Sequence, residues 1–182
     1  LRISGRVSAL SGRWTSAARA DFDAAVEFER LSLRYDRGRA VSDGPDAPVV
    51  KVPWFENLAG EAWFSPSEGA LRVRGRDAVL GFPGLFEIAA IPMSSIEADA
   101  RWTLDFDGAH YGIAMTVDRL EFANADARGA VRGTYRTGGR GPGLIDLTGS
   151  LERAQANRVA RYLPLMIAPS VRDWVAHAIQ DG

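Results

Sequence analysis

The side chains of this sequence that are able to do chemistry are few and scattered. The two histidines are His110 and His177, and no serine lies in the strand–turn–helix elbow that a nucleophile needs. Asp99 and Asp105 alternate with apolar residues, as carboxylates on a solvated sheet face do. We therefore expect no catalytic residue, no metal site, no cofactor and no enzymatic activity.

The stretch "GGRGPG" at 138–143 is the nearest approach to a phosphate-binding loop. It lacks the Lys-Ser/Thr end of such loops, and no helical pattern follows it. We interpret it as a loop between two strands.

Composition limits the class of protein. The chain has 182 residues, 46% of them apolar and 25% charged, with a net charge of −1. These values are typical of a folded domain and argue against nucleic-acid binding, which usually needs a basic surface.

Without cysteine there are neither disulfides nor thiolate metal sites. No stretch approaches the roughly 18 apolar residues of a membrane span. The start at Leu1, already in a strand pattern, predicts a fragment whose signal peptide or anchor lies elsewhere.

An alternating pattern typical of β-strands runs from residue 1 to about residue 150. In "LRISGRVSAL" it predicts one apolar face, formed by Leu1, Ile3, Val7 and Ala9. In "DFDAAVEFERLSLRYD" the series from Phe22 to Phe28 changes phase before Leu31, Leu33 and Tyr35. A phase change inside a strand predicts a β-bulge.

A long hairpin is the clearest element. The even positions from Ile96 to Phe106 are apolar, and Asp107-Gly108 is a preferred two-residue hairpin turn. With that turn Trp102 faces Ile113 and Leu104 faces Tyr111. Arms of about a dozen residues span roughly 40 Å, which is long for a strand.

The C-terminal segment changes to a helical period. We expect a first helix from Leu151 to Leu163, ended by Pro164. Ser170 predicts the N-cap of a second helix. The apolar stripe of that helix is Val171, Trp174, Val175, Ala178 and Ile179. We expect a β-sheet segment over 1–151 and a helical segment over 152–182, with Trp174 and Ile179 buried against the sheet.

The strands present more apolar face than the two short helices are able to cover. Either a second sheet packs on it, as in a β-sandwich, or part of it stays open as a groove. The pattern by itself favours the sandwich.

The end of the chain resembles YhdP-like proteins of the AsmA-like superfamily. These proteins carry a "RYLP…W…A…G" signature between stretches of long β-strand. The residues that match are Arg161, Tyr162, Leu163, Pro164, Trp174, Ala178 and Gly182. The strand–turn rhythm of "FENLAGEAWFSPSEGALRV" and "GFPGLFEIAAIPMSSIEADARW" is also similar, so the likeness covers at least residues 54–182.

This resemblance implies an internal fragment of a large envelope protein of Gram-negative bacteria. Such a protein is anchored in the inner membrane outside this chain and works in the periplasm. The resemblance also implies a mainly β fold. This fold is a long, twisted, largely antiparallel sheet that forms an open groove or curved half-barrel, with a short C-terminal helical pair. The groove would move phospholipid between the inner and outer membranes.

The implied partners are phospholipid acyl chains and other segments of the same long chain, with envelope proteins as further candidates. The residues expected to contact acyl chains are Ile96, Ala98, Trp102, Leu104, Phe106, Ile113, Met115 and Val117. The alternative is a structural or assembly module of the envelope, with a closed β-sandwich core and no lipid conduit.

Overall fold

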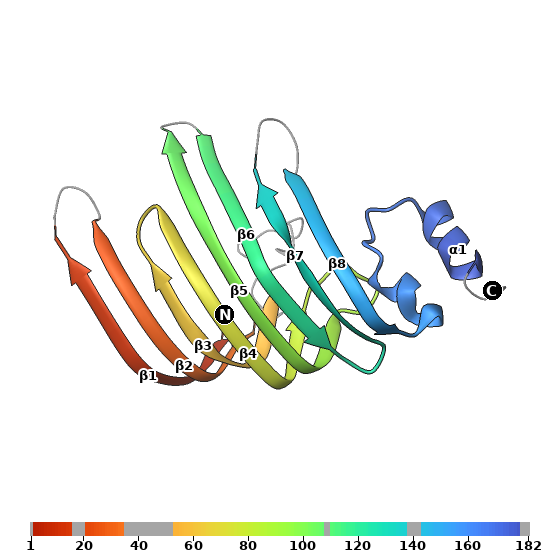
Figure 1. The fold of residues 1–182 in the computed structure, drawn as a ribbon, viewed down its shortest axis with the longest axis horizontal. Helices are drawn as coiled ribbons and strands as arrows, with labels where there is room; N and C mark the ends of the chain where they lie inside the picture. Colours follow the sequence, from red (N-terminus) through yellow and green to blue (C-terminus); the bar gives the residue numbers. More distant parts are fainter. Residues whose placement is uncertain (1, 16–20, 35–52, 108–109, 138–142, 179–182) are drawn as a thin grey trace, which may run out of the picture.

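The structure is a computed structural model that describes all residues except 1, 16–20, 35–52, 108–109, 138–142 and 179–182. Within these residues eight strands are followed by two short helices (Figure 1). The strands are β1 (Arg2–Trp14), β2 (Phe22–Arg34), β3 (Trp54–Phe64), β4 (Glu68–Gly81), β5 (Ala90–Asp107), β6 (His110–Ala123), β7 (Ala127–Arg136) and β8 (Leu144–Ala154). The helices are η1 (Ala156–Tyr162), a 3₁₀-helix, and α1 (Pro169–Ala178).

All eight strands belong to one sheet. Their order is β1-β2-β3-β4-β5-β6-β7-β8, and every neighbouring pair is antiparallel. The sheet is open and strongly curved, with β1 and β8 as its edges (Figure 1). The prediction of a mainly β, antiparallel sheet is confirmed. The sandwich that the pattern favoured is wrong, because the described strands form a single layer.

The sheet bends where bulges interrupt the pairing. The β2–β3 register shifts between Phe28 and Leu31, where Arg30 has φ 50°, which confirms the bulge expected in β2. The β1 pattern holds only in part, because two register shifts put Ala9 opposite Glu27 and thus on the polar face. A bulge adds one unpaired residue, so the side chains beyond it exchange faces.

The β5–β6 hairpin exists, but its predicted register is wrong by two residues near the turn and by three beyond the register shift between Asp99 and Ala100, where Ala98 pairs with Leu120. Trp102 pairs with Met115 and Leu104 with Ile113, while Asp107 pairs with His110. The connection is therefore residues 108–109, which lie outside the described part of the chain. A shift of two residues leaves every side chain on its original face, so the alternation fits both registers equally well.

Residues from β2 to β5 form a packed core inside the bend. It consists of the buried side chains of Phe28, Leu58, Ala78, Ile91, Met93 and Ile96. The connection between β4 and β5 contributes Phe82 and Phe86, whose rings meet edge to face at 5.8 Å. Tyr162 of η1 packs on the same cluster from the far edge of the sheet. The core side chains are therefore buried by the bend of the sheet, by the connection between β4 and β5, and by η1.

The C-terminal segment differs from its prediction in where its helices begin. The residues after Leu151 continue β8 as far as Ala154, and only then does the 3₁₀-helix η1 begin. Helix α1 starts at Pro169, because Ala168 C=O accepts hydrogen bonds from Val171 N and Arg172 N, so Ser170 is not the N-cap.

Trp174 is 70% exposed, so its predicted burial is wrong. Among the described elements α1 contacts η1 and lies beyond β8 (Figure 1). Ile179 and Gly182 lie outside the described residues.

Candidate functional site

Apolar side chains of all eight strands lie on one face of the sheet, which we call the apolar face. Cross-strand partners share a face, so the strand pairing fixes its members. They are Ile3, Val7, Leu10 and Trp14 (β1); Phe22, Ala24, Val26, Phe28, Leu31 and Leu33 (β2); Phe55, Leu58, Ala62 and Phe64 (β3); Leu71, Val73, Ala78 and Leu80 (β4); Ile91, Met93, Ile96, Ala98, Ala100, Trp102 and Leu104 (β5); Ile113, Met115, Val117, Leu120 and Phe122 (β6); Ala127, Val131 and Tyr135 (β7); and Ile145, Leu147, Leu151 and Ala154 (β8). None of these side chains is charged.

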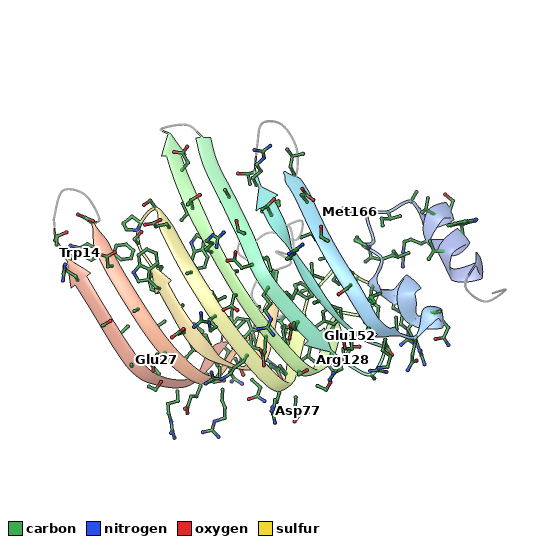
Figure 2. The ribbon with its side chains drawn as sticks, in the orientation of Figure 1. Trp14, Glu27, Asp77, Arg128, Glu152 and Met166 are labelled. Atoms are coloured by element: carbon green, nitrogen blue, oxygen red, sulfur yellow. The ribbon has the colours of Figure 1, made fainter. Side chains whose placement is uncertain are left out.

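The apolar face has a packed end and an open end. At the bend its side chains form the core, and Ile96 is only 6% exposed. Toward the other end of the inner strands the side chains are less covered, with Ile113 at 37% and Phe64 at 36% exposure, and the edge strands β1 and β8 are exposed along their whole length. Trp14 marks this open end on β1 (Figure 2). The open end is therefore the part of the face that a ligand can reach.

A row of large side chains crosses the open end. The Trp14 and Phe22 rings stack at 5.7 Å, and Phe22 meets Phe64 edge to face at 6.1 Å. The Trp102 indole lies over Gly69 of β4, where an added Cβ would come within 2.4 Å of the ring. Glycine at this position lets the indole lie flat along the sheet and keeps the face smooth.

The eight predicted contact residues lie at alternating positions of β5 and β6, on this one face. Ile96 belongs to the packed core; Ala98, Trp102, Leu104, Met115 and Val117 are half-buried; Ile113 is exposed; and the side chain of Phe106 lies outside the described residues. The prediction omitted the apolar side chains of the other six strands. Their alternation is visible in the sequence, but their faces follow only from the strand pairing.

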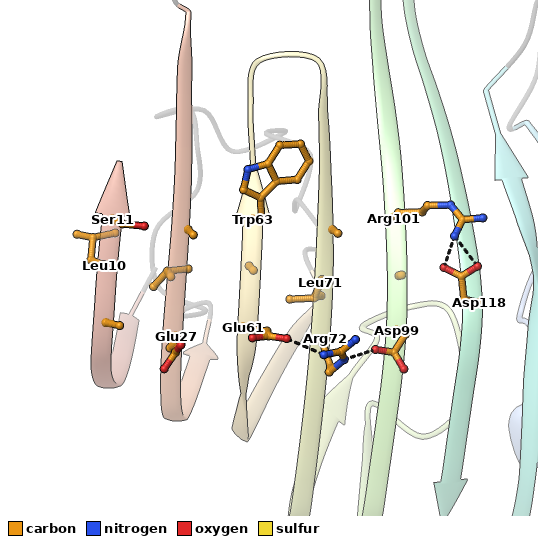
Figure 3. Close-up of a pocket in the computed structure, with 16 residues that line it drawn as sticks. Leu10, Ser11, Glu27, Glu61, Trp63, Leu71, Arg72, Asp99, Arg101 and Asp118 are labelled. Atoms are coloured by element: carbon orange, nitrogen blue, oxygen red, sulfur yellow. Dashed lines mark hydrogen bonds and ion pairs between the residues drawn. The ribbon is translucent and has the colours of Figure 1, made fainter. Parts of the chain in front are cut away.

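The opposite face carries the charges, which pair across strands (Figure 3). Arg72 of β4 donates to Glu61 of β3 at 2.8 Å and to Asp99 of β5 at 2.7 Å. Its hydrogen bond to Asp99, followed by the charges of both carboxylates, raises the pKa of the Arg72 guanidinium. Arg101 donates to Asp118 at 2.7 Å. Such exposed pairs keep this face hydrated and contribute little to stability, because water screens them.

A shallow cavity of about 450 Å³ lies among these ion pairs (Figure 3). Its lining combines Trp63 with charged residues such as Glu27 and with small residues such as Ala25 and Ala70. We interpret it as a solvated hollow between two rows of side chains.

Asn124 ties the hairpin between β6 and β7 to the C-terminal segment. It is 8% exposed, and its Oδ1 accepts hydrogen bonds from Asp126 N at 2.9 Å and Ala127 N at 2.7 Å. Its Nδ2 donates to the Tyr162 hydroxyl at 3.1 Å, which in turn donates to Asp126 Oδ2 at 2.8 Å. Burial, and then the bond to Asp126, raises the pKa of Tyr162. The tyrosine of the "RYLP" signature thus has a structural role.

The described residues contain no group of three or more His, Cys, Asp or Glu arranged to hold a metal ion. None of the described helices has the length and apolar character of a membrane span.

The described strands thus form a single curved sheet with one charged face and one apolar face that is covered only at the bend. The chain belongs to the YhdP protein family, whose match covers residues 1–182. The resemblance noted in the sequence is therefore confirmed. This family suggests a lipid-transport-related envelope protein and is not known for enzymatic activity. No curated protein and no solved structure matches the chain.

Proposed function

We propose that this chain is a segment of a β-groove that carries phospholipid between the inner and outer membranes of a bacterial envelope. The supporting observation is the apolar face, which continues across eight strands without a charged side chain. Contact with hydrocarbon is non-directional and spreads over area, so such a face suits acyl chains better than a substrate that must be oriented.

The exposed surface is unusually large for the chain length. It amounts to 13233 Å², against about 8,600 Å² expected for a compact protein of 19.7 kDa. Monomeric proteins rarely expose apolar patches of more than a few hundred Å², and larger ones mark interaction sites. An acyl chain on the open end of the apolar face would remove part of its apolar surface from water.

We place the acyl chains over Ala98, Trp102, Leu104, Ile113, Met115 and Val117, with Ile96 beneath them in the core and Phe106 at the end of β5. The phospholipid headgroup would stay at the rim, because burying a charge without a partner is prohibitive and this face offers no partner.

The chain would work in the periplasm as part of a longer protein anchored in the inner membrane. In the described sheet β1 and β8 each pair with one strand only. Their other edges present backbone groups that other segments of the same protein are able to extend.

Two crosslinking positions on β5 and β6 test the proposal. A photo-crosslinker at Met115 lies on the apolar face, and one at the exposed Thr103 lies on the polar face. We expect phospholipid adducts at Met115, and phospholipid in organic extracts of the purified protein. Adducts at Thr103 with none at Met115 would contradict the groove.

Charge placed on the apolar face should block passage of lipid. We expect Ala98→Asp and Met115→Arg to abolish lipid transfer between vesicles, because a lipid tail would have to pass a hydrated charge. Thr103→Asp is the control, since its side chain points to solvent on the other face. Equal transfer by all three variants would refute the proposed path.

An assembly role is the competing proposal, and the open edges of β1 and β8 favour it. It predicts that the crosslinker at Met115 captures protein and not lipid. The extraction experiment separates the two, because an assembly module needs no bound phospholipid.

A further inference from the structure

The polar face is hollowed at the bend by a second cavity, of about 950 Å³. Four arginines line it, namely Arg30 of β2, Arg74 and Arg76 of β4, and Arg128 of β7. The carboxylates in the lining belong to Glu29 and Glu97. The lining therefore has four cations against two anions, in a chain whose net charge is −1.

Among the described residues none of these four arginines forms an ion pair, whereas Arg34, Arg72, Arg101, Arg119 and Arg172 all do. Described arginines elsewhere, such as Arg132 and Arg136, are also without an ion pair, so what sets the four apart is that they line one cavity. Small side chains separate two of them, since Arg76 pairs with Ser95, Ser95 with Ala123, and Ala123 with Arg128. Because cross-strand partners share a face, Arg76 and Arg128 lie on the same face of the sheet.

The backbone shapes this cavity. The non-glycine residues described with positive φ are Arg30 at 50°, Asn57 at 60° and Asp77 at 50°. Arg30 and Asn57 line the cavity, and Asp77 follows Arg76. Asn57 Nδ2 donates to Arg76 C=O at 2.8 Å, which holds the two bulged strands together.

Such left-handed residues are strained and cluster at functional sites. Here the bulges turn consecutive side chains outward, so that Glu29 and Arg30 are both exposed, as are Arg76 and Asp77. Asp77 and Arg128 lie at the bent end of the sheet in Figure 2, far from Trp14 at the open end.

We propose that this cavity binds phosphate groups. Guanidinium groups match the oxygens of a phosphate with paired, charge-assisted hydrogen bonds. A cavity of about 950 Å³ lies within the range of about 300–1,000 Å³ that holds small ligands. The phosphate belongs either to a lipid headgroup at a membrane surface or to a soluble molecule. This site lies on the face opposite to the proposed lipid groove and does not depend on it.

Two probes separate the sources. Titration calorimetry with inorganic pyrophosphate measures binding of soluble phosphate, and sedimentation with phosphatidylcholine vesicles, with or without phosphatidylglycerol, measures binding to lipid phosphate. We expect Arg74→Gln combined with Arg76→Gln to weaken binding by roughly tenfold or more. The matched control is Arg132→Gln combined with Arg136→Gln, which removes the same charge from the polar face of β7.

Loss of pyrophosphate binding in the cavity variant alone identifies a soluble ligand. Loss of vesicle binding in that variant, without pyrophosphate binding by the native chain, identifies a lipid headgroup. The proposal is overturned if the native chain binds neither probe, or if both double variants weaken binding equally. The substituted side chains of Arg74, Arg76, Arg132 and Arg136 are all exposed, so we expect neither double variant to change the melting temperature. If the cavity variant does change it, Arg128→Gln provides a second test of the cavity.

Discussion

At the scale of single residues, the buried amide of Asn124 joins parts of the chain that lie far apart in sequence. It satisfies two backbone N–H groups of the β6–β7 turn and holds the Tyr162 hydroxyl. Leaving a buried donor without a partner costs about 1–3 kcal/mol.

We expect Asn124→Ala to lower the free energy of unfolding by about 2–4 kcal/mol, because it leaves the turn donors unpaired. Urea denaturation followed by tryptophan fluorescence measures this change. The exposed Asn157 is the control, and Asn157→Ala should change stability by less than about 0.5 kcal/mol. Equal effects of the two substitutions would contradict the role given to Asn124.

We expect the folded chain to lose stability at high pH because of Tyr162. Its pKa is raised in the folded chain, chiefly by burial, so the folded state favours the protonated hydroxyl. The contribution of Tyr162 is thus fully present below the unfolded pKa of about 10 and is lost as pH rises through the raised value. Deprotonation would also place a phenolate beside Asp126.

Melting temperatures between about pH 8 and 11 test this, with Tyr162→Phe as the control. We expect the native chain to lose stability relative to the variant above about pH 10. Parallel pH profiles for the two proteins would show that the hydroxyl does not titrate as inferred.

At the scale of elements, the main contact of α1 among the described elements is with η1 and not with a strand. Beyond its contact with η1, Arg172 forms an ion pair with Glu87 at 3.3 Å, in the connection between β4 and β5. Leu165 N donates to Leu85 C=O at 2.8 Å in the same connection. The C-terminal segment is thus held at the bent end of the sheet and leaves the open end uncovered.

We therefore expect Trp174→Ala to change the free energy of unfolding by less than about 0.5 kcal/mol, since little of the indole is buried. Leu58→Ala, in the core of the bend, should cost about 2–5 kcal/mol in the same assay. A large cost for the tryptophan would mean that α1 packs on the sheet in solution.

At the scale of the whole molecule, the fold exposes apolar surface without being loosely packed. We expect the native chain to enhance the fluorescence of an apolar dye such as ANS while its near-ultraviolet circular dichroism still reports packed aromatic residues. A molten globule would bind the dye but lose the dichroism.

Titration with a fatty acid should displace this dye, because both compete for the apolar face. Met115→Arg should weaken dye binding, whereas Thr116→Arg, the neighbouring position on the polar face, should not. Dye binding that is the same in both variants would place the apolar surface elsewhere.

Much of this architecture can be predicted from residue order alone. Alternation of apolar and polar residues is a local property, so it identifies long strands and assigns the faces within each strand, as in β5 and β6. The bulge after Phe28 is equally local, because it appears as a change of phase. The eight predicted contact residues accordingly lie at positions of one face.

The tertiary structure alone decided the rest, because each remaining feature depends on contacts between distant segments. A register shift of two residues preserves every face, so only the pairing of Trp102 with Met115 fixed the hairpin. The apolar stripe of α1 is the same whether or not a partner covers it, and the fold left Trp174 in solvent. Whether eight strands form one open sheet or two packed ones depends on which strands become neighbours. That choice is made by hydrogen bonds across the sheet, which a period-two pattern within each strand does not encode.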